Sequence, residues 1–168
     1  MKLYYDEMET PVGILLLVSD GEKIVRIEYG SLADVEEKMM RWSNRYFDSP
    51  EFIRDASHVE HAKQELNEYF TGERKQFTFD FSFYGTPFQQ EVWQALFTAI
   101  EYGETKTYKD VAEAIGRPKA VRAVGGAVNK NPFSIVVPCH RVVGTNGSLT
   151  GYNGGLDKKE YLLKHEVK

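Results

Sequence analysis

The sequence predicts a two-part chain, with an α+β domain over residues 1–85 and a mostly helical domain over residues 86–168. Two observations indicate this fold class. β-Branched and aromatic runs separated by turn residues open the chain, whereas helical periodicity with capping residues begins at Thr86. The net charge also changes sign, from −7 (10 Lys+Arg against 17 Asp+Glu) before residue 86 to +3 (11 against 8) from there on. We therefore expect only the second domain to face a polyanion.

The length of 168 residues and the single cysteine limit what the chain can be. A chain of this size buries enough surface to fold without disulfides or metals. One cysteine excludes an internal disulfide and any zinc site built from several cysteines. No stretch reaches the roughly 18 uncharged apolar residues of a membrane span, and the first residues lack the apolar core of a signal peptide. We expect a cytoplasmic protein with no membrane partner.

The first domain begins with three strand-like runs, followed by two helical patterns and a further strand-like stretch. Turn residues separate the first three runs, which predicts an antiparallel meander. The expected strands are residues 3–5, 14–18 and 24–27, the helices lie around 32–42 and 59–70, and the last strand spans the alternating phenylalanines at 77–83. His58 and His61 have helical i,i+3 spacing, but no third ligand accompanies them, so we interpret them as a solvated helix face.

The second domain opens with a helix that carries its own start signals. Thr86 is the expected N-cap, Pro87 takes the first helical position and Gln89 completes a capping box. A short helix follows Thr107 and ends at Gly116, and another covers about residues 119–128. Two helices across a tight turn form a helix-turn-helix arrangement, which is common in DNA-binding proteins but not confined to them.

The second helix of this pair has few bulky side chains. Its small residues are Ala120, Ala123, Gly125, Gly126 and Ala127. Two interior glycines cost about 1 kcal/mol each relative to alanine, so the helix needs a reason to be slim. One reason is close approach to DNA, with Arg122 and Lys130 as the cations; the other is tight packing against the protein's own core.

The residue with the clearest chemical potential is Cys139, which follows a predicted buried strand at 135–137. A free thiol is mostly protonated at neutral pH, so a cysteine nucleophile needs a base or a cation nearby. His140 is adjacent, and on an extended segment its side chain would point away from the thiol and act through a water. Asn146-Gly147 indicates a type I′ turn, which would form a wing beside the helix pair.

The ordered motifs of the second domain resemble the O6-alkylguanine-DNA alkyltransferase family. The resemblance covers about residues 86–166, and the first domain is similar to the family only in its general layout of strands and helices. The motifs are Thr107-Tyr108, Arg117 to Gly126, Asn131-Pro132, Ile135 to Val143 with Pro-Cys-His-Arg-Val at its centre, and Gly151 to Leu156. The resemblance implies a ribonuclease H-like first domain and a winged helix-turn-helix in the second.

The resemblance also implies DNA repair by direct reversal, with no cofactor. Cys139 would attack the alkyl carbon on O6 of guanine, or of O4-alkylthymine as a second substrate, and would keep the alkyl group as a thioether in a single turnover. His140 would take the thiol proton through water, and Glu166 would polarise this histidine. Asn131 would brace the site, and the hydroxyl of Tyr108 would assist the departing guanine. No metal is expected, because the zinc site of some relatives needs further cysteines.

The partner implied by the resemblance is double-stranded DNA, bound from the minor groove by a monomer and placing the protein on the nucleoid. Arg122 would enter the base stack in place of the extruded nucleotide. The residues expected to contact DNA are Tyr108, Ala120, Arg122, Ala123, Gly125 and Lys130. Those expected to hold the extruded guanine are Arg122, Val142, Tyr152, Asn153 and Gly154.

Three other functions fit parts of the pattern. A binding-only relative would grip alkylated DNA without transfer, but such relatives lack the reactive cysteine that Cys139 supplies here. A helix-turn-helix transcription regulator would bind a specific sequence, usually as a dimer. A cysteine hydrolase would need an oxyanion-binding element, which the sequence around Cys139 does not indicate.

Overall fold

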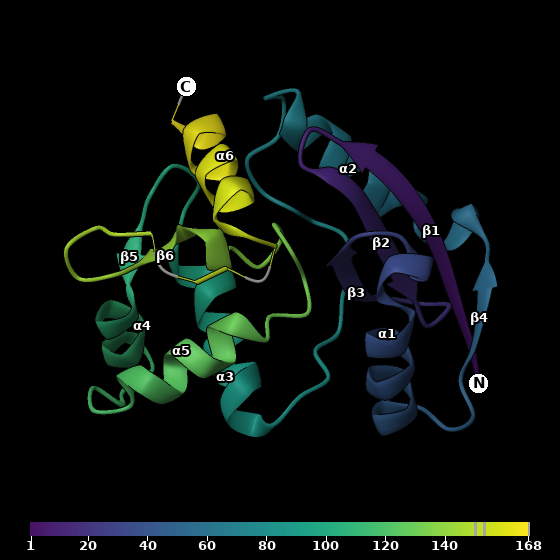
Figure 1. Ribbon diagram of the computed structural model, residues 1–168, viewed down its shortest axis with the longest axis horizontal. Coiled ribbons are helices and arrows are strands. Elements are labelled where there is room, and N and C mark those ends of the chain that lie inside the picture. Colours follow the sequence, from purple (N-terminus) through teal and green to yellow (C-terminus); the bar gives the residue numbers. More distant parts are fainter. Residues whose placement is uncertain (150, 153, 168) are drawn as a thin grey trace. The chain divides into compact units, whose positions relative to one another are not determined.

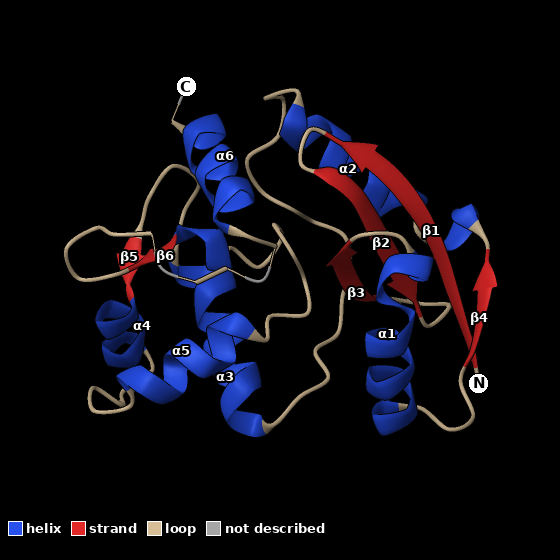
Figure 2. Ribbon diagram, in the orientation of Figure 1, coloured by secondary structure: helices blue, strands red, loops and turns tan. Residues whose placement is uncertain are grey.

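The computed structural model describes residues 1–149, 151–152 and 154–167, which form two separately packed units, Met1–Tyr84 and Gly85–Lys168. Figure 1 follows the chain through both units. Figure 2 shows a first unit built of strands and helices and a mainly helical second unit. The predicted fold class is confirmed. No helix in the described ranges is both long and apolar enough to cross a membrane.

The first unit is built on a four-stranded sheet with the order β3-β2-β1-β4. Its strands are β1 (Lys2–Thr10), β2 (Gly13–Ser19), β3 (Ile24–Tyr29) and β4 (Glu51–Arg54). β1, β2 and β3 pair antiparallel, which confirms the predicted meander. β4 pairs parallel to β1, and this strand was not predicted because four residues carry little periodic signal.

Two helices cover opposite faces of this sheet, namely α1 (Leu32–Tyr46) and α2 (Glu60–Phe70). On one face, Met39 and Trp42 of α1 pack in a cluster with Leu16. On the other face, Lys63 of α2 donates a hydrogen bond to Asp6 of β1 at 2.7 Å. Strand side chains alternate between faces, so both sides of the central strands become core. A 3₁₀ turn, Ala56–His58, precedes α2.

The alternating phenylalanines at 77–83 do not form the predicted strand. They make a single parallel bridge, from Ile24 to Phe81, and their rings pack edge to face in succession along the chain. The segment is anchored instead by the buried Glu65 of α2, whose carboxylate accepts hydrogen bonds from the backbone and side chain of Thr78. The alternation therefore reflects ring packing more than strand pairing.

In its described residues, the second unit contains four α-helices and a two-stranded parallel pair. The helices are α3 (Pro87–Ala99), α4 (Tyr108–Ala114), α5 (Val121–Asn129) and α6 (Leu156–Glu166), and the strands are β5 (Lys106–Thr107) and β6 (Val142–Val143). Thr86 and Thr107 cap α3 and α4 with complete capping boxes, which confirms the predicted helix starts. α5 begins two residues later than predicted. Val92, Leu96 and Val124 are completely buried between α3 and α5.

Three local predictions in the second unit are wrong. Residues 135–137 are buried but form a turn in which Ile135 has φ 74, not a strand. Cys139 begins a 3₁₀ turn, Cys139–Arg141, and does not lie on an extended segment. Asn146-Gly147 is not a type I′ turn, because that turn needs positive φ at both residues and only Gly147 has it. β6 pairs with β5. The loop after β6 is closed by a hydrogen bond of 2.9 Å from the Gly144 N–H to the Ser148 carbonyl.

Candidate functional site

Cys139 lies within a buried segment that runs from Asn131 to Val143. Its side chain is 5% exposed and its thiol is free. The 3₁₀ turn places Cys139, His140 and Arg141 on three different sides of a tight coil, so each can meet a different neighbour. The thiol is thus held at a defined position in the unit's interior and not on a mobile surface loop.

Asn131 is the residue that fixes this segment. Its Nδ2 donates to the carbonyls of Phe133 (3.2 Å) and Val137 (2.7 Å) and contacts Cys139 Sγ at 3.0 Å, and its Oδ1 accepts from the Phe133 N–H at 2.9 Å. These bonds enclose Ile135, whose left-handed backbone costs on the order of 1–3 kcal/mol. The amide therefore stabilises the strained turn and at the same time orients the sulfur.

Glu166, from the end of α6, lies against both residues that follow the cysteine. Its Oε2 is 2.7 Å from His140 Nε2, and Arg141 donates to both carboxylate oxygens at 2.8 and 3.0 Å. Arg141 also donates to the Ile100 carbonyl at 2.8 Å, which ties the cluster to the end of α3. Because the carboxylate accepts, Nε2 of His140 carries the proton, and the buried Nδ1 is left as an acceptor without a partner among the described residues.

Burial and charge set the protonation states in this cluster. Burial lowers the pKa of His140, aided by Arg141 and Lys159 and opposed by Glu166, so the imidazole is neutral. Burial alone would raise the pKa of Glu166, but the His140 and Arg141 contacts outweigh it and hold that pKa far below its ordinary value. Burial raises the pKa of the Cys139 thiol to about 11, with Asn131, Lys159 and Tyr152 acting in the opposite direction. The resting state is a neutral thiol beside a neutral base.

Of the charged residues of this cluster, Lys159 was not predicted from the sequence, and Arg141 was noted only as the residue that follows His140 in the motif. Arg141 is 6% exposed and Lys159 is completely buried, and Lys159 Nζ donates to the Val142 carbonyl at 2.6 Å. The signal for Lys159 lies in α6, whose buried positions Lys159, Leu162 and Glu166 follow helical spacing. A lysine on the core side of such a stripe indicates a buried partner.

The exposed face of α5 carries the small and cationic residues. Val124, Ala127 and Val128 are buried, whereas Arg122, Ala123 and Lys130 are exposed. A Cβ added at Gly126 would meet no atom within 4 Å. The small residues are therefore divided between the two faces of the helix, because Ala123 and Gly126 face outward whereas Ala127 packs in the core with Val124 and Val128. Ala120, half-buried, is the N-cap residue of α5.

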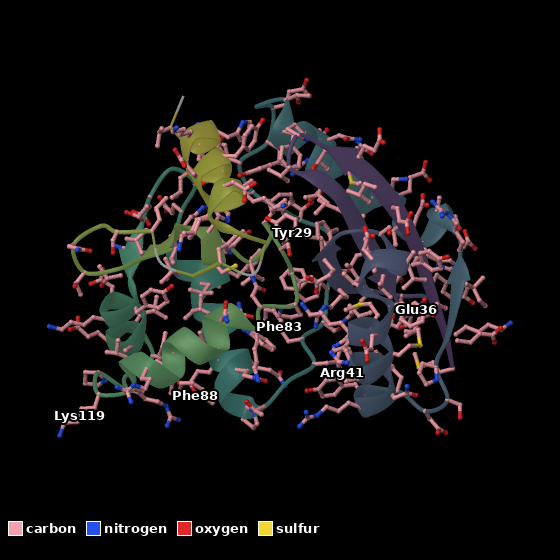
Figure 3. The ribbon with its side chains drawn as sticks, in the orientation of Figure 1. Tyr29, Glu36, Arg41, Phe83, Phe88 and Lys119 are labelled. Carbon is pink, nitrogen blue, oxygen red and sulfur yellow. The ribbon has the colours of Figure 1, made fainter. Side chains whose placement is uncertain are left out.

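The helix-turn-helix pair brings a predicted site residue, Tyr108, and a cation that was not predicted as one, Lys119, to this part of the unit. Tyr108 begins α4. A Cβ added at Gly125 would lie 3.9 Å from the Tyr108 ring, which is an ordinary van der Waals distance. Lys119 extends from the turn between α4 and α5 (Figure 3). The pair thus gathers an aromatic hydroxyl and several cations around one slim helix.

The remaining predicted residues lie on the loop after β6 or next to it. Val142 is buried and caps the 3₁₀ turn that begins at Cys139. Tyr152 is half-buried, and its hydrogen bond with the thiol lowers the pKa of Cys139. Gly154 is also half-buried. Asn153 lies outside the described residues. The structure therefore brings Cys139, its bracing amide and the histidine–carboxylate pair into one cluster.

The histidines of the first unit have other neighbours. His58 stacks on Tyr4 with ring centroids 4.0 Å apart, and His61 Nε2 lies 3.0 Å from Glu65. Within the described ranges, no three His, Cys, Asp or Glu side chains are grouped so that they could hold a metal ion.

Comparison with known proteins matches both units. The family described as "6-O-methylguanine DNA methyltransferase, ribonuclease-like domain" matches residues 3–83, and "6-O-methylguanine DNA methyltransferase, DNA binding domain" matches residues 87–168. The first match agrees with the ribonuclease H-like layout implied by the resemblance.

Relatives of similar length match nearly the whole chain. A methylated-DNA–protein-cysteine methyltransferase of Methanosarcina acetivorans is 45% identical over 98% of this chain and 98% of its own. The constitutive enzyme of that description from Bacillus subtilis is 44% identical over 97% and 94%. The crystal structure of Mycobacterium tuberculosis OGT in complex with DNA superimposes with a TM-score of 0.82 at 36% identity, over 99% of this chain and 93% of that one.

Proposed function

Because the chain belongs to the 6-O-methylguanine DNA methyltransferase family, we propose that it repairs DNA by moving the alkyl group from O6 of guanine onto its own Cys139. The sulfur attacks the alkyl carbon, the carbon–O6 bond breaks, and its electron pair stays on the guanine. The S–C bond of the resulting thioether is stable, because the Cys139 thiolate is a poor leaving group, so the protein acts once and is consumed. Guanine is restored in place, without excision.

The observation that carries this proposal is the surroundings of the thiol. Asn131 contacts Sγ, and the neighbouring His140 is neutral, held by Glu166 through Nε2 and with no described residue bonded to its Nδ1. A neutral imidazole with a free acceptor is the group that can take the thiol proton, directly or through a bridging water. The accompanying positive charge would then lie next to the Glu166 carboxylate, which stabilises it.

The DNA is held, in this proposal, by the slim outward face of α5. Extrusion of the damaged nucleotide costs a few kcal/mol, and Arg122 fills the gap that it leaves in the stack. Small residues at Ala123 and Gly126 allow the helix backbone to enter a minor groove about 6 Å wide. Tyr108 donates its hydroxyl to the ring nitrogen of the departing guanine, and the Val142 carbonyl and Tyr152 help to hold the base.

The protein works as a monomer in this proposal, because one thiol and one helix-turn-helix suffice for one lesion. A free nucleophilic thiol requires a reducing compartment, which is consistent with the cytoplasm. O4-alkylthymine presents the same alkyl–oxygen bond and is a second candidate substrate.

The stoichiometry of repair tests this proposal. Duplex DNA containing O6-methylguanine is incubated with increasing amounts of protein, and the remaining O6-methylguanine is measured after hydrolysis of the DNA. We expect one lesion removed per protein molecule, with guanine restored, and none removed by Cys139→Ala. Release of free base, or repeated turnover, would contradict alkyl transfer to the protein.

A further inference from the structure

Lys159 is a buried cation beside the reactive thiol for which the mechanism above has no role. Its side chain is completely buried, on the core side of α6, and a lysine in that position is rare because the charged form loses its hydration. Nζ donates to the Val142 carbonyl at 2.6 Å. Val142 in turn donates its N–H to the carbonyl of Cys139, so the ammonium is fixed two hydrogen bonds from the cysteine backbone.

The charges of Lys159 and Cys139 act on each other. Burial lowers the pKa of Lys159, and a negative charge on Cys139 raises it again. In the same way, burial raises the pKa of the thiol and the ammonium lowers it. Each group therefore makes the charged form of the other less costly, as expected for an ion pair that forms inside a protein.

The other groups around the thiol cannot replace this charge. Asn131 and Tyr152 are neutral hydrogen-bond donors. His140 is neutral until it takes the proton, because burial lowers its pKa. The guanidinium of Arg141 is held in a two-point contact with the Glu166 carboxylate, which balances its charge.

We propose that Lys159 is a positioning residue whose ammonium stabilises the Cys139 thiolate while the alkyl group is transferred. This inference rests on the proposed function of Cys139 as the alkyl acceptor. The S–H proton passes to His140, the sulfur electron pair forms the bond to the alkyl carbon, and the electron pair of the broken carbon–O6 bond leaves with guanine. The fixed positive charge favours the anionic sulfur before and during attack and is unchanged at the end.

The test measures thiol reactivity as a function of pH in Lys159→Gln. Glutamine can still donate a hydrogen bond to the Val142 carbonyl but carries no charge. Iodoacetamide modifies Cys139 as the single cysteine of the chain, so the rate of carbamidomethylation followed by intact mass reports this thiol alone. We expect the modification rate at pH 7.5 to fall about tenfold, the effect of a one-unit rise in thiol pKa, and to recover as the pH is raised. Methyl transfer from duplex O6-methylguanine should fall in parallel.

Three controls separate charge from structure. Lys164→Gln makes the same change at an exposed position of α6 and should leave the pH profile unchanged. Lys159→Arg, which keeps the charge, should restore reactivity at pH 7.5 at least in part. Lys159→Met, a neutral side chain of similar length, should reproduce the shift if the glutamine variant does not fold.

An equal loss of rate at every pH in Lys159→Gln, or no loss, would overturn the inference. A wild-type protein that reacts with iodoacetamide but accepts no methyl group would instead refute the proposed function. The two failures are therefore distinguishable in the same set of measurements.

Discussion

At the scale of single residues, the site depends on one carboxylate that serves two neighbours. Glu166 orients His140 and neutralises Arg141, while Asn131 holds the sulfur and the strained turn. None of these groups would be stable alone at its depth, because a buried charge or amide without a partner costs several kcal/mol. The groups that react also stabilise the fold, so substituting them should change both the folding stability and the rate of alkyl transfer.

Glu166→Gln should lower both stability and the rate of transfer. The amide cannot accept from both His140 and Arg141, so it leaves a buried guanidinium without its counter-charge, which costs about 3–5 kcal/mol. Thermal unfolding and the single-turnover rate at a temperature where the variant is folded are the measurements. Glu160→Gln, at an exposed position of the same helix, serves as the control and should change neither. Transfer at the wild-type rate would remove Glu166 from the mechanism.

Folding stability should depend on pH through His140. Its pKa is lowered in the folded state below the ordinary value of 6.5, so the unfolded chain binds the proton first as the pH falls. The free energy of unfolding should therefore decrease below pH 6.5, by up to about 1.4 kcal/mol per pH unit, until the folded-state pKa is reached. Chemical unfolding of a Trp42→Phe variant, in which Trp93 reports on the second unit, measures this. His140→Gln in that background should flatten the dependence between pH 6.5 and 5.5, and an unchanged slope would contradict the burial of a neutral imidazole.

At the scale of elements, capping residues made the helix starts predictable, whereas particular side-chain and strand contacts decided the features that were not predicted. Thr86 and Thr107 specify where α3 and α4 begin within a few residues of chain. An apolar run such as 135–137 predicts burial but not conformation, and the side-chain amide of Asn131, a few residues earlier, holds it in a turn. β4 likewise exists because β1 offers it an edge.

Arg122 on α5 should matter for duplex DNA and not for the chemistry itself. Arg122→Ala should slow methyl transfer from duplex O6-methylguanine by roughly tenfold or more, because extrusion of the nucleotide costs a few kcal/mol that the arginine helps to offset. Transfer of a benzyl group from the free base O6-benzylguanine, which needs no extrusion, should be unchanged. Arg41→Ala removes an exposed arginine of α1 (Figure 3) and provides the control. Equal losses with both substrates would place Arg122 in the chemical step.

A larger side chain at Gly126 should raise the folding stability and lower the affinity for duplex DNA. Gly126→Leu fills open space on an exposed helix face and should stabilise the fold by about 1 kcal/mol through helix propensity. The added side chain would hold the helix away from the groove, so duplex affinity should fall roughly tenfold, which corresponds to about 1.4 kcal/mol of steric conflict. Gln94→Leu, on the exposed side of α3, is the matched control for added apolar surface. Unchanged affinity would show that α5 does not approach DNA closely.

At the scale of the whole molecule, charge and chemistry are divided between the two units. The excess of acidic residues lies in the first and the cations of the helix-turn-helix lie in the second, together with the complete cluster around Cys139. The prediction of the nucleophile and its neighbour rested on Pro-Cys-His-Arg-Val within the ordered flanking motifs of the second domain, because four residues alone are not specific. The sequence could not show that Glu166 spans the distance to His140, or that Lys159 turns inward, because both depend on how α6 packs against the 3₁₀ turn.

The most direct test of the central claim is the mass of the intact protein after incubation with excess duplex DNA containing O6-methylguanine, followed by peptide mapping. The account predicts a gain of one methylene, about 14 Da, that stops at one equivalent, lies on Cys139 and is absent from Cys139→Ala. An unmodified protein that still binds the lesion tightly would contradict the account and would make this protein a damage sensor with a structural thiol.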